Sequence, residues 1–163
     1  MLPALHPVAA IFRLNTRLLH NCLAGVNDEL AGRRMAPGTN SLAFLAAHLA
    51  DSRHYVCGQL GRELANPLAE VLKRGKNLDE VGALPPISSI LKAWDAVSAH
   101  LLDVCEELTE EEISREARFR FPGADGTLAG TLTFMAQHDS YHIGQMSLLR
   151  AQLGLGGMSY KQD

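Results

Sequence analysis

Apolar side chains recur at steps of three and four residues through four long stretches of this chain, and that spacing is the strongest constraint on its fold. Such steps place side chains on one face of an α-helix, whereas a half-buried strand alternates at every second residue. In the first stretch the recurring residues are Leu5, Val8, Phe12, Leu19, Cys22, Leu23, Val26 and Leu30. The predicted helices run from about Leu5 to Leu30, from Thr39 or Asn40 to about Gly61, from Ser88 or Ser89 to Leu108, and from Thr127 to about Leu153.

Capping and turn-forming residues separate these stretches. Each of the last three begins with a Ser, Thr or Asn, whose side-chain oxygen can accept hydrogen bonds from the free N–H groups of a helix start. The connection between the second and third helices is long and includes Gly75, with a short helical turn expected from Leu68 to Leu72; residues 119–121 are expected to be extended. Four long helices without longer strand patterns predict an all-α fold, a four-helix bundle.

Length and charge narrow the class of protein. A chain of 163 residues with 47% apolar residues can bury one core, so we expect a single domain over residues 1–163. The 15 basic and 18 acidic residues are interspersed, giving a net charge of −3. Because no basic block is present to attract a phosphate backbone, a nucleic-acid partner is not expected.

The same sequence predicts a location and a redox state. No apolar run approaches the roughly 20 residues needed to cross a bilayer, so no membrane partner is expected. The first residues lack the basic start and apolar centre of a signal peptide, and the predicted location is therefore cytoplasmic. Cys22, Cys57 and Cys105 are widely spaced among apolar neighbours, which is typical of reduced core cysteines.

The helical turn of about 100° per residue predicts which histidines point inward. On the fourth helix, His138 and His142 fall in or beside the apolar stripe, and their four-residue spacing stacks the two rings one turn apart. On the second helix, His48 falls inside the apolar arc, whereas His54 falls on the opposite face and is predicted to point to solvent. The remaining histidines join no predicted cluster: His6, His20 and His100.

Three inward histidines favour a shared metal ion. A pair spaced His-x-x-x-His is a weak signal by itself, and a single inward histidine is more often a core residue bonded to a backbone carbonyl. Three together would leave ring N–H groups and lone pairs to satisfy, at a cost of about 1–3 kcal/mol for each one without a partner. One divalent ion on His48, His138 and His142 would satisfy the lone pairs together.

The surroundings of these histidines resemble the DinB-like superfamily, also called the YfiT-like metal-dependent hydrolases. Residues 137–145 read Gln-His-Asp-Ser-Tyr-His-Ile-Gly-Gln, and residues 47–50 read Ala-His-Leu-Ala. The family pattern is a histidine followed by Leu or Ile on the second helix, and His-x-x-x-His-x-Gly-Gln on the last long helix. The resemblance extends over essentially the whole chain.

This resemblance implies a bundle of DinB/YfiT-like topology, often dimeric, that holds Zn²⁺ or Ni²⁺. Carried over position by position, the ligands would be His48, His138 and His142, with water at the fourth position because no acidic ligand is evident. Some members of the family transfer low-molecular-weight thiols, one branch isomerises maleylpyruvate, and many have no assigned reaction. A homodimer is therefore expected from the resemblance.

Three neutral imidazoles and an open position are typical of a catalytic rather than a structural zinc site. Together with the resemblance, this ligand set predicts a metal-dependent enzyme, either a hydrolase or a low-molecular-weight thiol S-transferase, acting on a small molecule. The alternatives are a non-catalytic metal-binding or stress-response protein, and a helical dimer whose histidines hold no ion. Neither reaction is favoured by the sequence over the other.

Side chains one or two turns from the ligands complete the predicted site. Ser52, Tyr55 and Gln145 lie closest to it on the helical wheel. Gln145 is predicted to hold an imidazole or the substrate by a hydrogen bond, and Tyr55 either does the same or simply packs. Asp139 points about 100° away from His138 and is expected to cap a helix or to be solvated.

Overall fold

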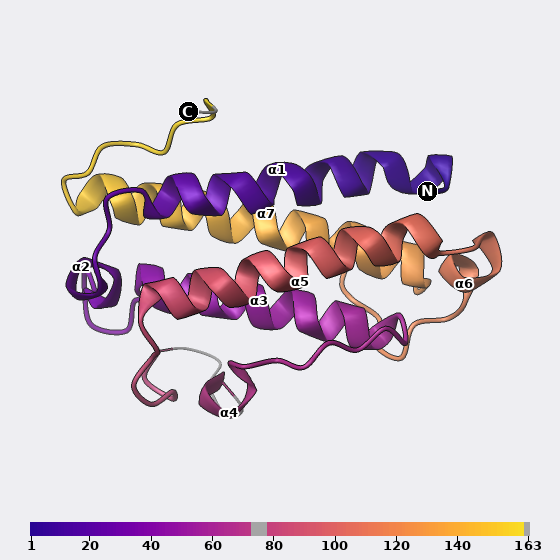
Figure 1. The fold of residues 1–163 in the computed structure, drawn as a ribbon, viewed down its shortest axis with the longest axis horizontal. Helices are drawn as coiled ribbons and strands as arrows, with labels where there is room; N and C mark the ends of the chain where they lie inside the picture. The colour runs from indigo at the N-terminus through magenta and orange to yellow at the C-terminus, as the bar shows by residue number, and fades with distance from the viewer. Residues whose placement is uncertain (73–77, 162–163) are drawn as a thin grey trace.

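The computed structural model describes residues 1–72 and 78–161, so Gly75 lies outside the described residues. Four long helices run side by side along the length of the molecule (Figure 1). They are α1 (His6–Leu23), α3 (Leu42–Gln59), α5 (Ile87–Glu107) and α7 (Leu128–Gln152). The shorter elements are η1 (Pro3–Leu5), α2 (Asp28–Gly32), α4 (Ala69–Leu72) and α6 (Glu110–Ser114). No strand occurs among the described residues, which confirms the predicted all-α bundle.

The first helix is shorter than predicted. It ends at Leu23, because Ala24 is not helical and Gly25 has a φ of +73°, a conformation that other residues rarely adopt. Asn27 then caps α2 by accepting a hydrogen bond from the backbone N–H of Leu30. The continuous helix predicted through Leu30 is therefore wrong, and a turn divides it into α1 and α2.

Two of the three predicted helix caps are also wrong. Ser41, rather than Thr39 or Asn40, caps α3, while the Asn40 side chain accepts a hydrogen bond from the N–H of Leu78. Helix α5 begins directly after Pro86 without a side-chain cap, so neither Ser88 nor Ser89 has that role. Pro86 fixes a backbone conformation suited to a helix start without a capping oxygen.

The cap of the last helix is the predicted one. Thr127 accepts a hydrogen bond from the N–H of Gly130 at 3.0 Å, and α7 ends within a residue of the expected position. The short turn expected from Leu68 to Leu72 is present as α4. Residues 119–121 form no strand, although an isolated bridge joins Glu116 to Thr127 nearby.

The core lies between the four long helices. Helix α7 packs against both α1 and α3, and α5 packs on the other side of α3 and against α1. The three cysteines are buried and unpaired, and burial raises their thiol pKa values to about 12, 12 and 11. Among the described residues no helix combines the length and the apolar character that crossing a bilayer requires.

A buried ion pair joins the helices at the centre of the bundle. Arg53 of α3 donates from Nε and Nη2 to Oδ2 of Asp139 on α7 at 2.9 and 2.8 Å, and the two side chains are 1% and 0% exposed. The guanidinium also donates to the Ser98 hydroxyl of α5 and to the carbonyl oxygen of Phe12 on α1. It lies 3.7 Å from the ring centroid of Trp94.

The prediction that Asp139 caps a helix or meets solvent is therefore wrong. The prediction rests on a single apolar stripe along α7, but this helix is covered by α1 on one flank and by α3 on the other. Asp139 lies on the covered side that the stripe does not include, and the cation of Arg53 makes its burial tolerable.

Candidate metal centre

The three predicted ligands meet where α3 and α7 lie against each other. His48 comes from the middle of α3, and His138 and His142 lie one turn apart on α7. The Nε2 atom of His138 is 3.2 Å from that of His48 and 3.1 Å from that of His142. Zn–N bonds of 2.0–2.1 Å in a tetrahedral site separate two ligand nitrogens by about 3.3 Å. The observed spacing therefore fits one ion with small adjustments.

The three rings are arranged around a common point. Their potential ligand atoms all lie within 4.8 Å of one another. The ring planes are steeply inclined, at 65° between His48 and His138 and 87° between His48 and His142. Phe44 stacks on His48 with an interplanar angle of 2°, and Phe134 stacks on His138 at 29°. The ring centroids in these two pairs are 6.1 and 6.3 Å apart, so an aromatic ring lies beside each of the two imidazoles.

Gln145 determines which nitrogen of His142 carries hydrogen. Its Oε1 atom lies 2.6 Å from Nδ1 of His142, and a carbonyl oxygen can only accept, so Nδ1 donates. The Nε2 lone pair of His142 then points to the other two rings. The Gln145 amide in turn donates to the hydroxyl of Tyr141 at 3.1 Å, which holds its orientation.

The contacts of His138 test whether an ion suits this arrangement. Since Nε2 of His142 has only a lone pair to offer, the contact with His138 is favourable only if His138 carries hydrogen on Nε2. That hydrogen cannot also serve the His48 contact fully, and Nδ1 of His138 is buried without a hydrogen-bond partner. A cation among the three Nε2 lone pairs removes the conflict between these ring contacts, so the donor set fits a divalent metal.

Burial keeps the three imidazoles neutral. It lowers the pKa of His48 to about 4, an effect that the nearby His142 ring increases. It lowers the pKa of His138 to about 4 in the same way, with His142 and His48 adding to the shift. The pKa of His142 is lowered by burial as well, against the opposing effect of the hydrogen bond that its Nδ1 donates to Gln145. Neutral rings have lone pairs ready for a metal at neutral pH.

Ser52 and Tyr55 lie beside the three histidines but do not touch the ligand nitrogens. The Ser52 hydroxyl donates to the carbonyl oxygen of His48 at 2.8 Å, so it is used within α3. Tyr55 is 42% exposed and meets the ring of Phe121 edge-on, with centroids 6.4 Å apart. Both residues line a pocket of 320 Å³ that opens onto His48 and His138.

Residues that the sequence alone did not predict complete this pocket. Phe119 and Phe121 come from the loop before α7, and Phe134 comes from α7 itself. Asp51 also lines it and accepts a hydrogen bond from the Asn66 side chain at 2.6 Å. The only sequence signal for this wall was the alternation of Phe119 and Phe121, which places two rings on one side of an extended segment.

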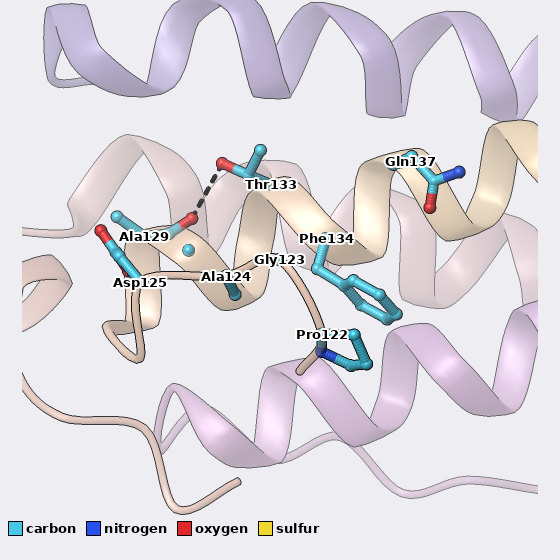
Figure 2. Close-up of a pocket in the computed structure, with 9 residues that line it drawn as sticks. Pro122, Gly123, Ala124, Asp125, Ala129, Thr133, Phe134 and Gln137 are labelled. Atoms are coloured by element: carbon cyan, nitrogen blue, oxygen red, sulfur yellow. Dashed lines mark hydrogen bonds between the residues drawn. The ribbon is translucent and has the colours of Figure 1, made fainter. Parts of the chain in front are cut away.

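Two other pockets lie close to the histidines without including them. The first, of 530 Å³, is enclosed by the turn at 122–125 and the start of α7, where Phe134 and Pro122 flank one side (Figure 2). The Thr133 hydroxyl at its edge donates to the carbonyl of Ala129 and is not free. The second, of 730 Å³, reaches the three-histidine cluster only through Gln145.

The prediction that His54 points to solvent is wrong. Its side chain is buried, with Nδ1 3.2 Å from the carbonyl oxygen of Leu64. The chain after α3 runs back along that helix (Figure 1) and covers the face that was predicted to be exposed to solvent. His100 contacts the carbonyl of Arg62 in the same segment, and His20 pairs with Asp95, so none of the three joins the three-histidine cluster.

Comparison with known proteins assigns the chain to a family. Comparison with curated proteins finds no match. The family model of the DinB superfamily matches residues 11–146, a span that contains all three clustered histidines and most of the four long helices. Since this match covers well over half of the sequence, the chain belongs to the DinB superfamily.

Proposed function

We propose that the protein is a metal-dependent enzyme whose Zn²⁺ or Ni²⁺ ion is bound by the Nε2 atoms of His48, His138 and His142. The observation that supports this most directly is the convergence of three neutral imidazoles within 4.8 Å of one another. The adjoining pocket gives a small molecule access to two of them. Three protein ligands leave a position for water or substrate, as in catalytic zinc sites.

A divalent ion bound here supplies Lewis-acid chemistry, since it lowers the pKa of a ligated water or thiol and polarises an acyl oxygen. The protein's own groups prepare the site for it. Gln145 fixes the tautomer of His142, and Phe44 and Phe134 lie beside the other two rings. Because all three ligands are neutral, none of them offsets the positive charge of the ion.

Two reactions are compatible with this ligand set. Hydrolysis would need a water, and thiol transfer a thiol, at the position that His48, His138 and His142 would leave open on the ion. We therefore propose that the enzyme is either a hydrolase or a low-molecular-weight thiol S-transferase. A homodimer is also proposed. Size-exclusion chromatography with light scattering tests it, and a monomeric mass would contradict it.

A non-catalytic metal-binding or stress-response protein is the second candidate. It is favoured by the state of the polar groups in the pocket, because Ser52 donates to a backbone carbonyl and Asp51 is engaged by Asn66. The Ser52 hydrogen is therefore already donated, and one of the two Asp51 carboxylate oxygens already accepts, which reduces the groups in the pocket that can transfer a proton. In this case the site would bind metal without turning over a substrate.

Metal binding and turnover separate these functions. Metal content of the purified protein and Zn²⁺ titration by calorimetry should give one ion per chain, and His48→Ala, His138→Ala and His142→Ala should each abolish tight binding. His20→Ala is the matched control, because His20 is exposed and pairs with Asp95 instead. Metal binding that survives all three ligand substitutions would contradict the proposed site.

Turnover is then assayed on the metal-loaded protein with thiols plus electrophiles, and with ester and amide substrates. An enzyme should turn over at least one class and lose this activity in the three ligand variants. Binding without turnover across the whole panel supports the non-catalytic candidate, and turnover that persists in the variants contradicts metal catalysis.

A further inference from the structure

We infer that the pocket beside the histidines binds an uncharged aromatic group of one or two rings, with the rest of the ligand directed to the metal position. We call it the aromatic pocket; its walls are Tyr55, Phe119, Phe121, Phe134, His48 and His138. That this ligand is the substrate rests on the proposed function; that the pocket takes an aromatic ring does not. Its 320 Å³ lies at the lower end of ligand pockets, which suits a ligand of this size.

The aromatic side chains form a continuous wall from the pocket rim to the histidines. Phe121 stacks on Phe134 with centroids 4.4 Å apart and planes inclined by 12°. Phe119 meets Phe121 edge-on at 5.1 Å, and Phe134 stacks on His138 at 6.3 Å. Rings that support one another hold their orientation, and they offer both faces and edges to a further ring.

The loop that carries two of these rings is closed at its base. The N–H of Ala117 donates to Gly126 at 2.8 Å, and the N–H of Leu128 donates to Arg115 at 3.0 Å. Gly126 has a φ of +88°, and a Cβ atom there would lie 2.8 Å from Nε of Arg120. The loop is therefore a built element, and it presents Phe119 and Phe121 to the face formed by α3 and α7.

Phe119 has no role in the core that would account for its position. It is 57% exposed at the rim of the pocket, and its ring contact is with Phe121. Large exposed apolar side chains gathered around a concave site mark surfaces that bind apolar ligands. A ligand ring that covers Phe119 would remove this apolar surface from water.

The charge of the lining selects against an anion. No Lys or Arg is among the residues that line the pocket, and its one charged residue is Asp51. A carboxylate or phosphate placed against these rings, away from the metal position, would lose hydration without a cationic side chain to replace it, and would face the like charge of Asp51. An uncharged ring meets neither cost. The polar end of such a ligand reaches the side of the pocket where His48 and His138 lie.

The test uses metal-free protein, so that no probe can bind through an ion. Naphthalene-2-methanol serves as the uncharged probe and 2-naphthoate as its anionic counterpart, and calorimetry or ligand fluorescence gives the dissociation constants. We expect the alcohol to bind and the carboxylate to bind at least about tenfold more weakly, a difference equivalent to about 1.4 kcal/mol. Equal affinities would overturn the charge argument.

Two variants locate the bound probe. Phe121→Ala removes the central ring and should weaken alcohol binding about tenfold, since an aromatic pair contributes up to about 1.5 kcal/mol beyond its buried area. Phe119→Ala removes only the exposed rim ring, so it keeps the test decisive should Phe121→Ala fail to fold. Leu148→Ala is the control, because this exposed residue lines the 730 Å³ pocket instead.

The outcomes for the pocket and for the metal site are separable. Zn²⁺ affinity of Phe119→Ala should stay within about twofold of the unmodified protein, because Phe119 has no contact with the ligand rings. If the probe binds as described but no metal does, the proposed function fails and the aromatic pocket stands. If metal binds but neither phenylalanine variant weakens the probe, or Leu148→Ala does, the inference is overturned.

Discussion

Replacing Arg53 by methionine should destabilise the fold, chiefly because it leaves the buried Asp139 carboxylate without its partner. Arg53 also donates to the Thr16 hydroxyl. The Ser98 and Thr16 hydroxyls lose little, because each donates to a carbonyl oxygen in its own helix. Asp139 has no such alternative: its Oδ2 is bonded only to Arg53, its Oδ1 has no partner, and the residue is 0% exposed. Removing one member of a buried ion pair costs about 3–5 kcal/mol.

The loss of folding stability in Arg53→Met should depend on pH, because the Asp139 carboxyl group titrates. Burial already raises the pKa of Asp139 to about 6 against the opposing effect of Arg53, and without the guanidinium it rises further. The native variant then binds a proton that the unfolded chain, with an ordinary carboxyl pKa near 3.9, releases. The stability of the variant therefore falls as the pH rises from about 4 to the raised pKa of Asp139, and it levels off above that pKa.

Urea unfolding at about pH 5 and pH 8 measures this loss, with a chelator present so that bound metal does not add stability. The change in the free energy of unfolding should be largest at the higher pH. Trp94 is the only tryptophan, and its ring lies under the guanidinium. Its fluorescence therefore reports unfolding around the ion pair, while circular dichroism reports the loss of helix.

The double variant Arg53→Met with Asp139→Leu is the decisive control. Replacing a whole buried pair by apolar residues of similar volume is often neutral or stabilising, so this protein should recover most of the loss. A single variant within about 1 kcal/mol of the parent at pH 8, or a double variant no more stable than the single one, would refute the argument from an uncompensated charge.

Three further results are expected at the metal centre. Zn²⁺ at 100 times its dissociation constant should stabilise the parent by about 2.7 kcal/mol and leave His142→Ala unchanged in urea titrations, with His20→Ala responding like the parent. Zn²⁺ affinity should fall less than about tenfold between pH 7.5 and 5.5, because the low pKa values of His48 and His138 leave no protons to displace there and His142, whose pKa is also lowered, is the one ligand left to take up a proton; a fall of a hundredfold or more would mean ordinary histidines. Gln145→Leu should weaken Zn²⁺ binding about 10–100-fold in calorimetry by freeing the His142 tautomer, and an unchanged affinity would show that the hydrogen bond does not matter.

The features that depend on local spacing were the ones the sequence predicted well. The four long helices and the Thr127 cap follow from short-range patterns, and the three clustered histidines lie on the covered faces that their helical positions indicate. His48 and His138 are ninety positions apart, so their meeting also needed the family pattern or the packing of α3 on α7.

The features that depend on which segment covers a face could not be read from the pattern. His54 is buried because a later stretch of chain returns over α3, and Asp139 is buried because α7 has two covered flanks. The aromatic pocket joins a loop to two helices, and no periodicity links Phe121 to Tyr55 or Phe134. The α3 cap prediction failed because Ser41 is as suitable as its neighbour Asn40, and the α5 prediction failed because that helix begins after Pro86 without a capping side chain.

The ion pair between Arg53 and Asp139 also sets the register of the two helices that carry the histidines. Arg53 follows His48 by five residues on α3, and Asp139 directly follows His138 on α7. Sliding α7 along α3 by a single turn, about 5.4 Å, would separate the charges as well as the imidazoles. The geometry of the three nitrogens is thus fixed by the folded scaffold, and an arriving ion meets a site whose ordering was completed when the helices packed.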